Sequence, residues 1–251
     1  MKKKSEIMFD KYTSNYDKSI IEIRLKYYHS YRVEKLMKEL AIKLNLSKEE
    51  IRIAELIGLL HDIGRFEQVK KYGTCSDVKS GVDHGDQSCI YLFDEGHIRD
   101  YIDDDKYDSI IKDAIKYHNK LKIDDSVKDK NLLFAKMIKD MDKVDIYRVL
   151  KEEYTGSFNV KERNEKVYKD FMSHKLIDNH DKKSRTDSVY AHFAFLYDVF
   201  FKESYEILDD TNNLNDYLTT VTVVNDDDNN KAWLELLNEV YKYMNDFRKK
   251  D

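Results

Sequence analysis

Proline is absent from this chain, and glycine is almost confined to one short stretch. Six of the seven glycines lie between positions 58 and 96. Proline and glycine are the residues that most disfavour helix interiors, so the rest of the chain can form long, uninterrupted helices. The sequence therefore predicts an all-α fold in which breaks are concentrated in residues 58–96.

Length and charge limit the class of protein. A chain of 251 residues can form one large domain or two small ones, with an ample core. Charged residues make up 37% and the net charge is -5, so we expect neither general nucleic-acid binding nor membrane binding. Without an apolar run of signal-peptide or membrane-spanning length, we expect a cytoplasmic protein. Cys75 and Cys89 are then expected to be free thiols.

Apolar residues at helical spacing predict the main helices. Three stretches stand out, from Ile20 to Leu44, from Ile51 to about Asp62 and from Asn131 to about Glu153. Ser47 and Glu50 form a capping box before the second of these. Further helices are expected from Asp83 through Leu92, from Asp103–Asp105 through His118, and at about 160–175, 186–208 and 231–249. A weak strand pattern lies near Tyr217–Val224, and residues 63–83 are predicted to form an irregular loop.

Histidine and aspartate recur at the ends or on the inner faces of these helices. His61 and Asp62 are adjacent at the end of an apolar run, although both side chains prefer water unless something pairs with them. A divalent cation satisfies an imidazole nitrogen and a carboxylate oxygen together. One histidine on an apolar face is more often a hydrogen-bonded core residue than a ligand, but a series is harder to explain in that way. The series is His29, His61, Asp62, His84, His118 and Asp142.

The order of these residues resembles the HD-domain phosphohydrolase superfamily, an all-helical domain in which a His, a His-Asp doublet and a distant Asp converge on a metal. The resemblance covers about residues 20–150. It implies a first metal held by His29, His61, Asp62 and Asp142. The chain is similar to the subgroup with two additional histidines, here His84 and His118, which implies a second metal bridged to the first by Asp62.

Two aspartates compete for the last ligand position. Counting 100° per residue from Phe134, Asp145 lies nearer the centre of the inner stripe than Asp142 does. The sequence around Asp142 is what resembles the last motif of the family, so Asp142 is the assignment and Asp145 is the alternative. By the same count Asp140 lies off the stripe, where we expect it to be exposed.

The ligand types suit one or two divalent ions, from Mn, Fe, Co, Ni, Zn or Mg, without choosing among them. Such an ion lets bound water lose its proton and attack phosphorus at neutral pH. The implied catalytic residues are Asp62, Arg65, His84 and His118. Arg65 is also a candidate substrate-binding residue, because guanidinium matches phosphate oxygens, or else a surface arginine; a lysine is common there in related proteins. Lys143 is the second substrate-binding candidate, although helical phase points it away from the inner face.

We expect an HD-type helical core at residues 1–155 and a C-terminal helical extension at 156–251, either packed on the core or continuous with it. The aromatic helices after residue 186 either complete the core or bury a homodimer interface.

The resemblance implies a metal-dependent phosphohydrolase that cleaves a phosphate ester or anhydride of a nucleotide, so the expected partner is a phosphorylated small molecule. It leaves open a phosphomonoesterase, a phosphodiesterase and a pyrophosphohydrolase. The branch that cleaves cyclic dinucleotides carries a Gly-Tyr-Pro element, which a chain without proline cannot contain. The alternatives are a non-catalytic nucleotide sensor, a di-iron oxygenase on the same scaffold, and a helical interaction protein with fortuitous histidines.

Overall fold

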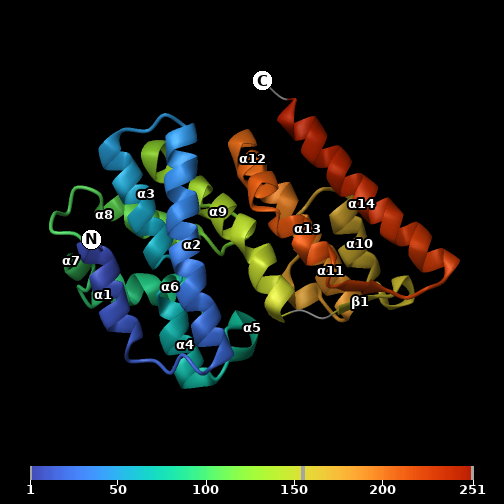
Figure 1. Cartoon of the computed structure of the whole chain (residues 1–251), viewed down its shortest axis with the longest axis horizontal. Coiled ribbons are helices and arrows are strands. Elements are labelled where there is room, and N and C mark those ends of the chain that lie inside the picture. Colours follow the sequence, from blue (N-terminus) through green and yellow to red (C-terminus); the bar gives the residue numbers. More distant parts are fainter. Residues whose placement is uncertain (1, 154–155, 250–251) are drawn as a thin grey trace. The chain divides into compact units, whose positions relative to one another are not determined.

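The described part of the protein is mostly helical and contains one small pair of strands (Figure 1). The computed structural model describes residues 2–153 and 156–249. The predicted all-α class is confirmed. The chain divides into two compact units, one ending at Asp142 and the other beginning at Lys143, inside helix α9. The predicted domain division at 155/156 falls at residues 154–155, which lie outside the described residues.

The first unit is a bundle of helices that vary widely in length. Its long helices are α2 (Ile21–Lys43), α3 (Lys48–Leu60) and the first half of α9 (Asp129–Glu153). Around them lie α1 (Lys4–Thr13), α4 (Gly64–Tyr72), α5 (Asp77–Ser80), α6 (His84–Cys89), the π-helix η1 (Ile90–Asp94), α7 (Ile98–Tyr101) and α8 (Asp108–Tyr117).

Helices α2 and α3 lie side by side and form the centre of this unit (Figure 1). Val33, Met37 and Leu40 of α2 and Ile57 and Leu60 of α3 are completely buried. The two backbones approach closely at Gly58, because a Cβ atom there would lie 2.8 Å from both the Cα of Glu34 and the carbonyl oxygen of Val33. Only glycine allows this helix pair its spacing.

Several helix boundaries follow the predicted caps, whereas others do not. Ser47 and Glu50 form the predicted capping box of α3, and Asp83 caps α6. The prediction of an irregular loop over residues 63–83 is wrong, because α4 and α5 lie within it. The glycines here end helices instead of preventing them: Gly73 follows α4 and Gly81 follows α5, both in the left-handed conformation. The helix expected from Asp103–Asp105 begins only at Asp108.

The second unit combines helices with a parallel pair of three-residue strands. Its elements are β1 (Gly156–Phe158), the 3-10 turns η2 (Val160–Glu162), η3 (Asn179–Asp181) and η4 (Phe195–Asp198), the helices α10 (Glu165–Met172), α11 (Arg185–Ala194), α12 (Lys202–Thr211), α13 (Asn213–Leu218) and α14 (Asp227–Arg248), and β2 (Val221–Val223). Strand β2 lies where the weak strand pattern was noted. The single helix predicted at 186–208 is interrupted, since the backbone is extended at Val199 and Phe201. β-branched and aromatic residues favour that conformation.

Two smaller expectations concern cysteines and membranes. Neither Cys75 nor Cys89 forms a disulfide bond in the structure, in agreement with the prediction. Within residues 2–153 and 156–249, no helix has both the length and the apolar character that crossing a membrane requires.

The close approach at Gly58 generates a stability prediction. Gly58→Ala should lower the free energy of unfolding by about 1–3 kcal/mol, because backbone atoms of α2 would have to move away from the added methyl group. Urea unfolding followed by circular dichroism measures the change. The higher helix propensity of alanine, about 1 kcal/mol relative to glycine, acts in the opposite direction and reduces the net loss of stability. A variant as stable as the original, or more stable, would show that the two helices separate without cost.

Candidate metal centre

Five helices bring the six predicted ligands to one place in the first unit. His29 projects from α2, and His61 and Asp62 follow the last turn of α3. His84 opens α6, directly after its capping residue Asp83, and His118 ends α8. Asp142 comes from α9. The four histidines and Asp62 are buried, and Asp142 is partly exposed.

The first group of ligands surrounds the His29 and His61 rings. Their Nε2 atoms are 3.2 Å apart. Asp142 Oδ1 lies 3.0 Å from Nε2 of His29 and 3.7 Å from Nε2 of His61. Asp62 Oδ2 lies 3.6 Å from each of these two nitrogens. Four donor atoms from three helices therefore converge.

The second group lies on the other side of the Asp62 carboxylate. The Nε2 atoms of His84 and His118 are 2.9 Å apart. Asp62 Oδ1 is 3.3 Å from Nε2 of His84 and 3.5 Å from Nε2 of His118. One carboxylate thus presents a different oxygen to each histidine pair.

Hydrogen bonds on the far side of the rings fix where the protons are. His61 Nδ1 donates to the Gly58 carbonyl at 2.8 Å, and His118 Nδ1 donates to the Ile115 carbonyl at 2.6 Å. His84 Nδ1 lies 2.6 Å from Asp77 Oδ2. A carbonyl oxygen can only accept, so His61 and His118 donate from Nδ1, and Nε2 of each ring, which carries the lone pair when the ring is neutral, faces inward. Burial lowers the pKa of His118 to about 4, which keeps it neutral at pH 7.

Facing lone pairs at these distances repel one another unless a cation lies between them. Ligands that share one ion through bonds of about 2.1 Å lie about 3.0–3.4 Å apart for bond angles of 90–110°. The separations of 2.9–3.7 Å within both groups are close to this range. These residues can hold a divalent metal ion, and the Asp62 carboxylate faces both histidine pairs.

Lys26 is a member of this site that the sequence analysis did not identify. Its Nζ lies 2.7 Å from Asp62 Oδ2. Burial is the largest influence and acts to lower the pKa of Lys26, but the negative charge of Asp62, with smaller contributions that include Asp142, raises the pKa overall. Burial likewise acts to raise the pKa of Asp62, and Lys26 with the surrounding histidines holds it well below its usual value. Lys26 precedes His29 by three residues, a spacing that puts both on one helix face.

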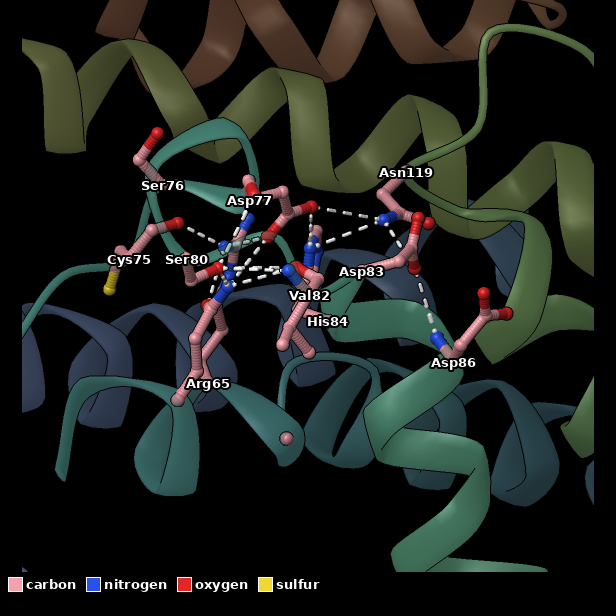
Figure 2. Close-up of polar contacts among 12 residues, drawn as sticks. Arg65, Cys75, Ser76, Asp77, Ser80, Val82, Asp83, His84, Asp86 and Asn119 are labelled. Atoms are coloured by element: carbon pink, nitrogen blue, oxygen red, sulfur yellow. Dashed lines mark hydrogen bonds and ion pairs between the residues drawn. The ribbon is translucent and has the colours of Figure 1, made fainter. Parts of the chain in front are cut away.

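Asp77 is the second residue that the sequence analysis missed, and Figure 2 shows it between Arg65 and His84. Its Oδ2 accepts the hydrogen bond from His84, and its Oδ1 accepts one from Arg65 Nη1 at 2.6 Å. Although burial acts to raise the pKa of Asp77, the bond to His84 and the charge of Arg65 lower it. Asn119 adds a contact to Oδ2 at 3.4 Å. Asp77 therefore fixes the orientation of a predicted ligand.

Arg65, predicted as a phosphate contact, is mostly buried and tied to the segment that follows α4. Besides Asp77, its Nη1 bonds to the side chain of Gln68 and the carbonyl of Cys75 (Figure 2). Its Nε lies 3.7 Å from Asp62 Oδ1, and no described residue offers this buried N–H a hydrogen-bond acceptor. The guanidinium thus adjoins the metal centre with one donor unused.

Asp142 and Asp145, the two candidates in α9 for the last metal ligand, differ in burial and in whether they belong to a ligand group. Asp142 is the one partly exposed residue between 137 and 145, and it reaches His29, whereas Asp145 is buried and belongs to neither ligand group. Asp140 is fully buried, so the prediction that it is exposed is wrong. Counting helical phase gave the wrong burial for Asp140, because this part of α9 is covered on nearly every side.

Lys143 pairs with Asp198 at 2.7 Å, in the second unit, and its role as a substrate contact remains a prediction.

Comparison with known proteins gives one match. Residues 27–147 match the family model described as HD domain, a range that includes all six predicted ligands. The resemblance noted in the sequence is thereby confirmed at the level of the superfamily. No curated protein and no solved structure matches the chain.

The position of Asp77 predicts its effect on metal binding. Asp77→Ala should weaken divalent metal binding by about 10–100-fold, because the His84 ring loses the partner that orients it. Titration with Mn²⁺ or Co²⁺, followed by calorimetry, measures the affinity. Asp86→Ala is the matched control, since Asp86 is exposed on the same helix α6. Equal affinities in the two variants would contradict the assigned role.

Proposed function

Because residues 27–147 of this chain are an HD domain, we propose that it is a metal-dependent phosphohydrolase. HD domains bind divalent metals, and members of the family are largely metal-dependent phosphohydrolases. We propose further that the bond cleaved is a phosphate ester or anhydride of a nucleotide. The observation that best supports hydrolysis is the Asp62 carboxylate, whose two oxygens face different histidine pairs.

The proposed ligands form two groups that share Asp62. The first is completed by His29, His61 and Asp142, and the second by His84 and His118. Divalent ions held there would supply a water of lowered pKa and a Lewis acid for the phosphoryl oxygens. The protein contributes fixed ring orientations, because backbone carbonyls hold His61 and His118 and Asp77 holds His84.

Two cationic side chains act beside these ligands. Lys26 keeps Asp62 ionised and places a positive charge next to it. Arg65 has a buried Nε–H without an acceptor, 3.7 Å from Asp62 Oδ1, so this group is the proposed donor to a phosphoryl oxygen. Arg65 Nη1 donates a hydrogen bond to Asp77. Arg65 therefore also holds in place the carboxylate that orients His84.

A substrate panel tests the proposal. Purified protein with Mn²⁺ should release phosphate, pyrophosphate or nucleoside from at least one member of a panel of nucleoside mono-, di- and triphosphates and dinucleotides. Asp62→Ala should abolish this turnover, since it removes the atoms shared by both groups. Asp86→Ala, an exposed change on α6, should leave turnover unchanged.

Other outcomes distinguish the alternative functions. Tight nucleotide binding by metal-loaded protein without turnover would favour the non-catalytic sensor. Bound iron with oxygen consumption would favour the di-iron oxygenase. Absence of stoichiometric metal from the purified protein would favour the interaction protein. Each of these results, combined with no turnover of any panel member in the presence of Mn²⁺, would overturn the phosphohydrolase.

A further inference from the structure

A cavity that none of the predicted ligands lines lies on the first unit beside α1, α4 and η1. Its volume is about 320 Å³. Aromatic rings and carboxylates dominate its lining, which includes Tyr12, Tyr16, Glu67, Gln87, Tyr91 and Glu95. No basic side chain is among the described residues that line it. The metal centre, by contrast, is lined by imidazoles and suits a phosphate.

The three tyrosine rings form one contiguous, supported wall. The ring centroid of Tyr12 lies 4.7 Å from that of Tyr91 and 5.2 Å from that of Tyr16. Phe66, which is fully buried, packs behind Tyr12 and Tyr16. His97 stacks on Tyr91, with the planes inclined by 18°. The wall is therefore held in place by packing.

Tyr91 owes its position to unusual backbone. It lies in the π-helix η1, which continues α6 after Cys89. π-Helical turns are rare and are frequently found at functional sites, because the wider turn redirects side chains at a cost in backbone energy. Tyr91, which lies within η1, is part of the tyrosine wall of the cavity.

The carboxylates and a nearby lysine indicate the charge of the ligand. Glu67 and Glu95 lie at the rim, each about half exposed, and the Tyr16 hydroxyl is 3.1 Å from Glu67 Oε2. The ammonium group of Lys70 lies 5.4 Å from the centre of the Tyr16 ring and 3.9 Å from Glu67 Oε2. The protein thus already holds one alkylammonium against this combination of ring and carboxylate.

We propose that this cavity binds a small-molecule alkylammonium ion, either a quaternary ammonium or a protonated amine. Tyrosine rings attract such cations through their negative faces, and Glu67 and Glu95 add opposite charge. The carboxylates repel an anion, so the phosphorylated substrate of the proposed hydrolase is the wrong chemistry for this cavity. The proposal is independent of the proposed function.

Two molecules of the same shape separate charge from apolar fit. Choline and 3,3-dimethylbutan-1-ol differ in that a quaternary nitrogen replaces a carbon atom. Calorimetric titration of the whole chain at pH 7 should give saturable binding of one choline, with the alcohol at least ~10-fold weaker. Equal binding of the two molecules, or no binding of choline, would overturn the proposal.

Variants locate the binding. Tyr91→Leu and Glu67→Gln should each weaken choline binding by about 3–10-fold, because each removes one source of attraction. Tyr28→Leu is the control, since Tyr28 is 55% exposed on α2 outside the cavity. Glu67→Gln changes a half-exposed rim residue, so the test survives if Tyr91→Leu misfolds. Choline affinity that is the same in Glu67→Gln, Tyr28→Leu and the original protein would place binding elsewhere and overturn the proposal.

Discussion

The first unit depends on a single buried carboxylate, that of Asp62. An ionised group with almost no exposure requires opposite charge or hydrogen bonds in every direction. Lys26 forms an ion pair with one carboxylate oxygen of Asp62, and the four imidazole rings lie around both oxygens. Those partners come from α2, α6 and α8 and from the end of α3 itself, so satisfying one side chain fixes the arrangement of most of the unit. The chemistry proposed for the site uses this same convergence.

The residue types and their order carried much of the site in the sequence. His29, the His61-Asp62 doublet, His84 and His118 could all be selected because histidines at helix ends and on apolar faces stand out in a charged chain. Lys26 and Asp77 could not be selected in the same way. Lysine and aspartate are among the commonest residues here, and only the contacts of Asp62 and His84 distinguish these two. A single sequence does not distinguish the residues that contact a metal ligand from other lysines and aspartates.

Helix boundaries and helix phase show where pattern reasoning ends. The capping residues Ser47 and Asp83 act locally, so they could be recognised without knowing the fold. Residues 63–83 contain glycines and so favour a loop prediction, but Gly73 closes helix α4, because glycine is common both in loops and at helix ends. In α9, the choice between Asp142 and Asp145 assumed one inner face. A helix covered on nearly all sides has no such face, and only packing decides which residue meets the histidines.

Gly58 affects both the packing of α2 against α3 and the orientation of a predicted metal ligand. Its missing side chain lets α2 and α3 approach, and its carbonyl oxygen holds the His61 ring with Nε2 directed inward. A change that spreads the two helices would therefore also turn a predicted ligand, so a loss of stability and a loss of metal affinity would arrive together. A substitution at residue 33 or 34 cannot make space for a side chain at position 58, because the atoms that would clash with it belong to the main chain. Helix spacing and the orientation of His61 are therefore coupled through the backbone of this one residue.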